Sequence, residues 1–325
     1  MKFRSSLKIV FLSLFLPVVL NGCSESTNHS PKERYIDYVN PLMGTDSEYV
    51  LSNGNTYPAI AVPWGMHFWT PQTGEMGNGW AYAYDAYKIR GIKQTHQPSP
   101  WVNDYGAFSF MAVTGELKVD EEERASWFSH KAEVVKPNYY RVYLADHDVV
   151  VEVTPTDRAA IFRFTFPENK KSYILLDAFF RGSGVKIFPE QNRITGYSKN
   201  NRGGVPENFK NYFVAEFSRE FDGYLTWNEQ KVSRDRISAE GEHVGAVVEY
   251  ATRKGETVIV KVASSFISEE QAQLNLDREV GDKTFEQVKE EAAETCETEL
   301  QKIKVSGGTE EQRKTFYSTL YRVLL

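Results

Sequence analysis

Apolar residues alternate with polar ones along most of the chain from about Tyr35 to Phe266, and this period of two limits the fold more than any other feature. The segment AIFRFTF (160–166) places its three phenylalanines on one face of an extended chain and Ile, Arg and Thr on the other. Similar runs are VYLADHDVVVEVTP, SYILLDAFF, VGAVVEYAT and TVIVKVASSF. Many strands with no helix between them predict a mostly β fold, a large antiparallel sandwich of two stacked sheets.

One pair of strand-like runs is separated by a strong turn signal. The segment YFVAEFSREFDGYLTW (212–227) contains two alternating runs on either side of Asp222-Gly223. An Asp-Gly pair flanked by alternating hydrophobic residues is typical of a β-hairpin. The sequence therefore predicts that these two runs pair with each other.

After the β region, the spacing between apolar residues changes from two to three or four. Apolar residues between Thr284 and Lys304 predict one amphipathic helix, with acidic residues early and lysines at its end. Cys296 lies on the apolar stripe, so we expect a buried and unreactive thiol.

A second helical pattern follows Gly307-Gly308, which ends the first. Thr309 and Gln312 predict a capping box at the start of another amphipathic helix. The sequence ends at Leu325 inside this pattern, and we therefore expect it to be the N-terminal fragment of a longer protein.

The N-terminus has the features of an export signal. Three cations in MKFRSSLK precede the apolar run IVFLSLFLPVVL, which is too short to span a bilayer as a mature helix. Cys23 follows Asn21-Gly22, so we expect residues 1–22 to be removed and Cys23 to carry a lipid, as in a bacterial lipoprotein. An ordinary secretory signal with an incidental cysteine is the alternative. Residues 23–34 are expected to form a tether. The sequence leaves open whether the protein is located in the periplasm or at the outer membrane or cell surface.

Charge and cysteine content exclude some classes of protein. The 38 basic and 44 acidic residues give a net charge of −6, with no basic run after the N-terminus, which argues against a nucleic-acid partner. Cys23 and Cys296 are the only cysteines, so neither a disulfide framework nor a thiolate metal site is expected.

The acidic residues do not form a recognisable catalytic pair. The run from Asp120 to Glu123 is expected to be a solvated turn between strands. Asp146, Asp148 and Asp157 are expected to face water at strand ends, with metal binding as the weaker alternative.

Loops rich in aromatic rings lie between Tyr38 and Gly106. Flat rings can stack on sugars while neighbouring Asp, Asn and His bind hydroxyls, but such rings can equally cap the core of a sandwich. We expect Trp64 and Trp69 to cap the core. For Trp101, which lies between prolines and Asn103-Asp104, a ligand role and a structural role are weighted evenly.

Four of these segments, taken in order, resemble the N-terminal domain of glycoside hydrolase family 92: VNPLMGTD, NTYPAIAVPWGM, WAYAYD and GIKQTHQPSPWVNDYG. The later ASSFISEEQAQLNLDREV and GGTEEQRKTFYSTLYRVLL are similar to that family's run into its catalytic domain. The resemblance covers residues 35–325. Each segment alone would be weak, and their shared order makes the resemblance specific.

The resemblance implies an exported bacterial enzyme, of a kind common in gut Bacteroidetes, that removes terminal α-mannose from glycans such as N-glycans. Such enzymes are calcium-dependent and inverting, and one carboxylic acid and one carboxylate act on opposite faces of the sugar. The implied domains are a β-sandwich at 35–268, a helical linker at 269–308, and the start of a truncated (α/α)6 barrel at 309–325.

The family's catalytic carboxylates and nearly all its calcium ligands come from the barrel, so the resemblance assigns neither to this chain. Sandwich loops line part of the sugar pocket, at positions matching Gly44-Thr45-Asp46 and the block with His96, Trp101 and Asp104. Trp101 is expected to be a platform for the sugar next to the cleaved mannose, and Asp46 and Asp104 to be hydroxyl ligands or loop braces.

Two functions remain open from the sequence. The first is an exo-α-mannosidase whose activity needs the missing catalytic domain, so that this fragment is inactive by itself. The second is a free-standing lipoprotein, anchored in the membrane, that binds mannose-containing glycans with the same loops.

Overall fold

The alternating segments form strands in the structure, a computed structural model that describes residues 34–46, 56–76, 81–97 and 104–325. A short 3-10 turn, η1 (Tyr35–Tyr38), precedes the strands, and a second, η3 (Pro189–Gln191), joins two of them. All strand pairs recorded between the named strands are antiparallel.

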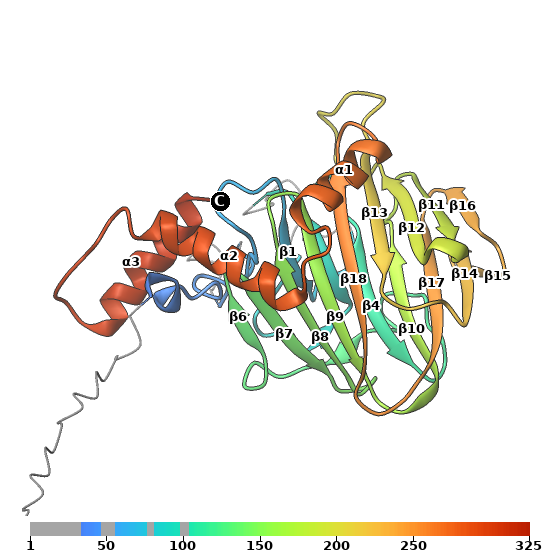
Figure 1. The fold of residues 1–325 in the computed structure, drawn as a ribbon, viewed down its shortest axis with the longest axis horizontal. Coiled ribbons are helices and arrows are strands. Elements are labelled where there is room, and N and C mark those ends of the chain that lie inside the picture. The colour runs from blue at the N-terminus through green and yellow to red at the C-terminus, as the bar shows by residue number, and fades with distance from the viewer. Residues whose placement is uncertain (1–33, 47–55, 77–80, 98–103) are drawn as a thin grey trace, which may run out of the picture. The chain divides into compact units, whose positions relative to one another are not determined.

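Two large sheets and one small one contain the strands (Figure 1). The first large sheet runs in the order β16 (Ser238–Gly241), β11 (Ser183–Phe188), β12 (Arg193–Ser198), β13 (Asn211–Phe217), β18 (Glu256–Ser265), β9 (Ala159–Phe166), β8 (Val149–Pro155), β7 (Tyr139–Leu144), β6 (Val134–Lys136). The second runs β1 (Phe68–Gln72), β3 (Gly91–Thr95), β4 (Ser109–Thr114), β10 (Asn169–Asp177), β17 (Val244–Thr252), β14 (Gly223–Asn228), β15 (Lys231–Arg234). The small sheet pairs β2 (Lys88–Ile89) with β5 (Ser126–Trp127).

The two large sheets enclose one hydrophobic core. The three phenylalanines of β9 lie in it together with Trp69 of β1 and Trp227 of β14, so both sheets contribute to the same cluster. Each fully buried aromatic side chain stabilises the fold by about 1.5–3 kcal/mol. The mostly β, two-sheet sandwich predicted from the alternation is confirmed.

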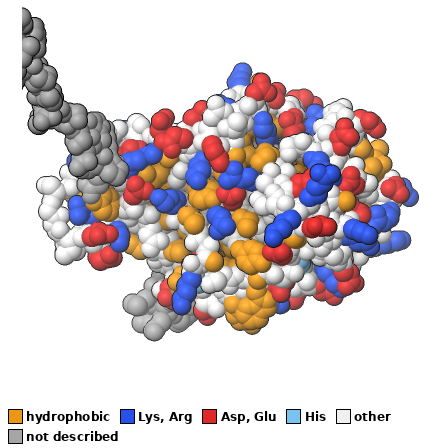
Figure 2. Space-filling model, turned by 60° about the horizontal axis from the view of Figure 1, so that its bottom comes forward, with side chains coloured by type: hydrophobic (Ala, Val, Ile, Leu, Met, Phe, Trp, Pro, Cys, Tyr) orange, Lys and Arg blue, Asp and Glu red, His pale blue; other side chains and the backbone are white. Residues whose placement is uncertain are grey.

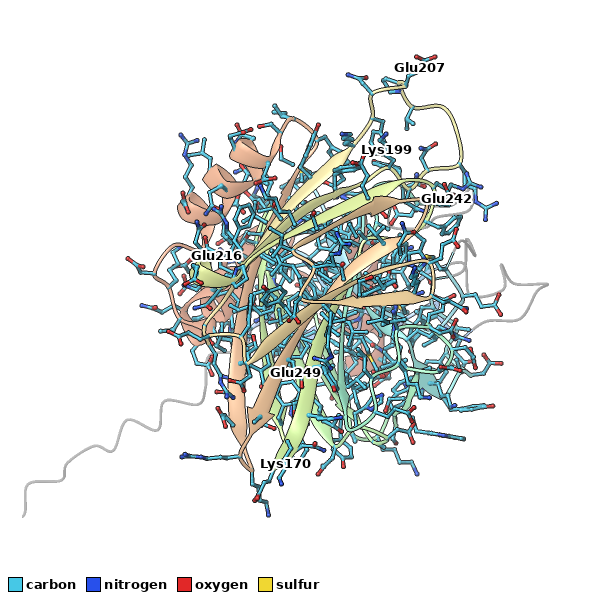
Figure 3. All side chains as sticks on the ribbon, turned by 90° about the vertical axis from the view of Figure 1, so that its right-hand side faces the viewer. Lys170, Lys199, Glu207, Glu216, Glu242 and Glu249 are labelled. Atoms are coloured by element: carbon cyan, nitrogen blue, oxygen red, sulfur yellow. The ribbon has the colours of Figure 1, made fainter. Side chains whose placement is uncertain are left out.

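Charged side chains mark the surface on both sides of this core. Figure 3 labels Glu216, which belongs to β13 of the first sheet, and Glu249, which belongs to β17 of the second. It also shows the connection between β12 and β13 standing out from the sheets, with Glu207 near its tip.

Helices cover the outer face of the first sheet. Figure 1 shows α1 (Glu269–Glu279) lying against β13 and β18, and α2 (Phe285–Leu300) follows it along the chain. Ile161 of β9 packs under Leu276 and Phe285 of these helices. Arg163, also on β9, pairs with Glu286 of α2 at 2.7 Å. The second face of β9, polar in the sequence pattern, is therefore the docking face for the helices.

The C-terminal helix α3 (Glu310–Val323) packs against α2 and η1. Tyr317 and Tyr321 of α3 share a cluster with Ile36 and Cys296, and the thiol is fully buried, as predicted. Burial raises the pKa of this thiol to about 12, so it stays protonated.

Both helix starts fit their sequence signals, but one helix end does not. Thr284 and Thr309 each close a capping box, and the predicted box at Thr309 is confirmed. The predicted single helix to Lys304 ends at Leu300 instead. Ile303, which the periodicity assigned to the apolar stripe, is 49% exposed.

The predicted hairpin at 212–227 is wrong, because β13 and β14 belong to different sheets. The bonds of Asp222 explain why the chain passes from one sheet to the other here. Its side chain accepts a hydrogen bond from the backbone of Ala251 at 2.6 Å, and its own N–H donates to Glu249 at 2.9 Å. The chain is thereby attached to β17 just before Gly223, and the second run pairs there.

The two tryptophans expected in the core differ. Trp69 is completely buried, as predicted, whereas Trp64 is 67% exposed and the expectation for it was wrong. Trp64 has a φ of 63° and sits in a turn closed by a hydrogen bond from Gly65 N–H to Val62 O. Because the turn sets the direction of the side chain, an apolar run here does not imply burial.

Candidate functional site

The predicted sugar-site residues lie on two segments of the described chain. Gly44, Thr45 and Asp46 form a turn after η1, and His96 and Asp104 lie just after β3. Trp101 lies outside the residues that the structure describes, so its predicted role stays a prediction, and Cys23 lies outside them too.

Tyr57 and Arg322 join the two segments. The Tyr57 hydroxyl is 2.6 Å from the Thr95 hydroxyl and donates to Gln97 O, which ties it to the end of β3. The Arg322 guanidinium, on α3, donates to Pro41 O at 2.8 Å, to Met43 O at 3.0 Å and, with its Nη2, to Tyr57 O at 3.4 Å. The helix at the C-terminus therefore holds the Gly44 turn against the His96 segment.

The turn itself is fixed by short-range bonds. Gly44 has a φ of 84°, which favours glycine, and its carbonyl accepts from the Thr56 hydroxyl at 2.7 Å. Thr45 is buried, and its hydroxyl donates to Leu42 O at 2.8 Å. Asp46 is exposed, so its carboxylate is the group of this turn that is open to a ligand.

His96 is buried and neutral. The backbone N–H of His96 donates to Asp104 Oδ1 at 3.0 Å, and the ring Nδ1 donates to the backbone oxygen of Tyr105 at 2.7 Å. Burial lowers the pKa of His96 to about 3, and the ring stacks on Tyr105 with 5.2 Å between centroids. His96 therefore positions the loop and does not exchange protons near neutral pH.

Asp104 and Lys93 form a buried pair beside His96. Lys93 Nζ is 3.9 Å from Asp104 Oδ2, and both side chains are at least 94% buried, with 6% and 1% exposed. Burial raises the pKa of Asp104 to about 6, partly offset by Lys93, and burial lowers the pKa of Lys93. Asp104 thus acts as a brace of this loop, which was one of its two predicted roles. Direct binding of a sugar hydroxyl by Asp104 stays a prediction.

A buried tyrosine cluster is influenced by both carboxylates. Tyr57 and Tyr82 pack with Ala59, Ala61 and Phe68. Burial raises the pKa of Tyr57, and Asp104 adds to this. Burial also raises the pKa of Tyr82, with a smaller contribution from Asp46. Asp46 and Asp104 therefore each act electrostatically on a tyrosine of the same cluster.

Four contributors to this site were not predicted from the sequence: Tyr57, Tyr82, Lys93 and Arg322. One signal was available. Lys93 occupies the middle of GIKQT, and every residue of the resulting strand β3 is buried. A lysine in so apolar a strand needs a carboxylate partner, which Asp104 supplies.

A separate cleft of about 460 Å³ is lined by Met76, Val119, Asp120, Glu121, Phe180, Glu229, Gln230 and His243. Two of its ionisable groups, Glu121 and His243, are engaged with the protein. Glu121 accepts from Met76 N–H at 2.8 Å, and burial raises its pKa, so the expectation that the whole acidic run faces water is wrong for this residue. His243 Nε2 donates to the buried Asp177 at 2.7 Å. These bonds give the groups structural roles.

Three aspartates weighed as metal ligands lie at the surface. Asp146, Asp148 and Asp157 are exposed, as expected. Within the described ranges, no group of three or more His, Cys, Asp or Glu residues is arranged to hold a metal ion. In the same ranges, no helix is both long and apolar enough to cross a bilayer.

Two family models match the chain. The glycosyl hydrolase family 92 N-terminal domain matches residues 38–265, and the glycosyl hydrolase family 92 catalytic domain matches residues 271–325. The predicted domain boundaries at 268 and 308 stay predictions.

Solved structures with the same fold come from Bacteroides thetaiotaomicron. A family GH92 inverting mannosidase is 45% identical, with a TM-score of 0.86 over 90% of this chain and 40% of its own. A family GH92 α-mannosidase is 31% identical, with a TM-score of 0.79 over 89% of this chain and 41% of its own; its complex with mannoimidazole has been solved.

A curated relative, described as an uncharacterized secreted glycosidase of Arthroderma benhamiae, is 23% identical across 89% of this chain and 41% of its own length. This chain therefore spans about two fifths of the relatives it matches.

Proposed function

This chain belongs to glycosyl hydrolase family 92, and on that basis we propose that it is the N-terminal part of an exo-α-mannosidase that releases terminal mannose from glycans such as N-glycans. The observation that carries the proposal is the 45% identity to an inverting mannosidase across 90% of this chain. The α-mannosidase relative solved with mannoimidazole supports mannose as the sugar.

The proposed role of the sandwich is to form one wall of the sugar pocket. Asp46 supplies an exposed carboxylate that can accept hydrogen bonds from hydroxyls, and Trp101 supplies a ring for the neighbouring sugar. His96 and Asp104, on either side of Trp101 in the sequence, are proposed to act as braces, since both are buried and bonded to each other. Arg322 keeps the two halves of this wall together.

The chemistry is proposed to be inverting and calcium-dependent. One carboxylic acid would protonate the leaving oxygen while a carboxylate activates water on the opposite face of the sugar. Calcium, when bound, would hold sugar hydroxyls through hard oxygen coordination. The catalytic acids and calcium ligands are proposed to lie outside this chain, whose residues bind and orient the sugar.

Stereochemistry and metal dependence test this proposal together. The product of the complete gene should release mannose from α-mannobiose, and proton NMR should detect β-mannose first, before mutarotation. A chelator should abolish the release, and calcium should restore it. The 325-residue chain alone should release none. If the complete product releases no mannose from any α-mannoside, the proposed function is wrong.

Export as a lipoprotein is a further part of the proposal. The secreted description of the curated relative supports export. Attachment at Cys23 would place the enzyme in the periplasm or on the cell surface. Metabolic labelling with an alkynyl fatty acid should mark the wild-type protein and leave Cys23→Ala unmarked. Equal labelling of both would contradict lipidation at this residue.

A further inference from the structure

Two large aromatic side chains stack on each other at the surface, away from the buried tyrosine cluster. Tyr87 is 58% exposed and Trp127 is 47% exposed. Their ring centroids are 4.3 Å apart, and the ring planes differ by 20°. Isolated exposed hydrophobic residues are common, but two stacked rings with this much exposure form a continuous flat surface.

The backbone holds both rings in place. Tyr87 directly precedes β2 and Trp127 ends β5, and these strands pair with Lys88 opposite Trp127. Phe128 N–H donates to Tyr87 O at 3.1 Å, and Ala145 N–H donates to Trp127 O at 2.9 Å. Because hydrogen bonds on two sides fix the chain, little conformational entropy remains to be lost when a ligand binds.

One exposed carboxylate is bonded to the backbone that carries the Trp127 ring. Asp146 Oδ2 accepts a hydrogen bond from the backbone N–H of Trp127 at 2.8 Å. Asp146 Oδ1 makes no hydrogen bond within the described part of the chain. Asp146 is exposed. An aromatic surface whose backbone also holds an exposed acceptor suits a sugar, whose apolar C–H face stacks while its hydroxyls donate hydrogen bonds.

The two rings by themselves are too small to form a stable protein interface. Aromatic side chains bury about 150–250 Å² each when fully covered, so two half-exposed rings offer about 200 Å². A specific protein interface needs about 800 Å² on each partner. The exposed residues Asp85 and Ser129 lie two positions along the chain from Tyr87 and Trp127. On the face drawn in Figure 2, hydrophobic side chains lie among charged and polar ones and gather most densely near the lower edge.

Ring contacts connect this surface with the candidate site. Phe128, next to Trp127, contacts His130 at 5.0 Å between centroids, and His130 stacks on Tyr84 at 4.1 Å. Tyr84 in turn packs on the buried cluster that contains Tyr57 and Tyr82. The aromatic pair and the candidate site are therefore linked by one series of packed side chains.

We propose that the Tyr87–Trp127 pair is a second carbohydrate-binding site, which takes a sugar ring of a neutral glycan and holds a large substrate near the candidate site. The expectation that this glycan contains mannose rests on the proposed function. The binding of a neutral sugar ring by the aromatic pair does not.

Affinity electrophoresis tests the proposal. The product of the complete gene is run through gels that contain soluble α-mannan or β-glucan, as wild type and as Tyr87→Ala, Trp127→Ala and Tyr143→Ala. Tyr143 is the matched control, because it is an exposed aromatic residue (38%) on β7 that takes part in no recorded ring stack of the described residues. Tyr87→Ala and Trp127→Ala should bind α-mannan about tenfold more weakly, and Tyr143→Ala should bind as wild type does.

Hydrolysis of an aryl α-mannoside, which is too small to reach the second site, separates the two proposals. Reduced mannan binding by Trp127→Ala with unchanged kcat/KM on the small substrate supports the second site. Retention by β-glucan alone, lost in Trp127→Ala, supports a sugar site but contradicts its proposed ligand. Equal binding by all variants overturns the second site, and so does the absence of any retardation of the wild type. In both cases, activity on the aryl mannoside leaves the proposed function intact.

Discussion

Replacing Arg322 with methionine should detach the C-terminal helix from the loop of the candidate site. Arg322 has no carboxylate partner among the hydrogen bonds and ion pairs recorded for the described residues; its guanidinium binds the carbonyl oxygens of Pro41, Met43 and Tyr57. Two of these bonds are short, at 2.8 and 3.0 Å. Methionine keeps much of the length of the side chain and removes all of the donors.

The bond lengths set the expected size of the effect. A hydrogen bond to a charged group contributes about 1.5–3 kcal/mol, so two such bonds contribute about 3–6 kcal/mol. Part of this is offset, because burial opposes the charge of Arg322 and lowers its pKa, and methionine does not carry that desolvation penalty. We expect a loss of about 2–4 kcal/mol in the free energy of unfolding.

Urea denaturation followed by circular dichroism measures this loss. With a slope near 3 kcal/mol per molar urea, the midpoint should fall by about 1 M. Lys314→Met is the matched control, because Lys314 is on the same helix and pairs only with Glu310 and Glu311 at the surface. Its midpoint should stay within about 0.2 M of wild type. An equal midpoint for the two variants would refute the reasoning.

Three further outcomes follow from the buried groups. Arg124→Met should destabilise the protein by about 3–5 kcal/mol in urea denaturation, because it removes the guanidinium that lies 2.7 Å from the buried Asp177 and leaves His243 as the remaining ionic partner, whereas adding Asp177→Leu should recover part of the loss. Burial opposes the charge of His243, but Asp177 outweighs it and raises the pKa of His243. The resulting stability is fully present below about pH 6.5 and disappears as the pH rises through the folded pKa, so His243→Gln should remove this step from a plot of urea midpoint against pH. Cys296 should not react with a thiol reagent at pH 8 until the protein is unfolded, and rapid labelling of the native protein would contradict its burial.

The fold could be predicted where one local pattern had one structural solution. The alternation in β9 determines which residues enter the core, and the capping box at Thr309 determines where α3 begins. The connection after Phe217 could not be predicted in this way. Its Asp222-Gly223 signal is compatible with a hairpin, and only bonds to β17, a strand more than twenty residues later in the chain, direct it to the other sheet. Which strand a segment joins is decided here by pairing with a distant part of the chain, and the local sequence does not show that pairing.

The environment of the residues in the candidate site could not be predicted from residue type. The sequence identified His96 and Asp104 by residue type, since both can bind hydroxyls or move protons. Residue type does not report burial, however, and burial places the pKa of His96 near 3 and that of Asp104 near 6. A side chain that is bonded to its neighbours and closed to solvent holds a loop in position.

The same reasoning separates the acidic residues of the chain into two groups. Asp104 and Asp177 are buried beside a cation, and each positions a segment of backbone: Asp104 accepts from the N–H of His96, and Asp177 from that of Phe179. Asp46 and Asp146 are exposed, and each can offer an oxygen to a ligand. If sugar binding depends on exposed acceptors, Asp46→Asn and Asp146→Asn should weaken glycan binding with little loss of stability. Asp104→Asn should instead lower stability first, because it leaves the buried Lys93 without a counter-charge.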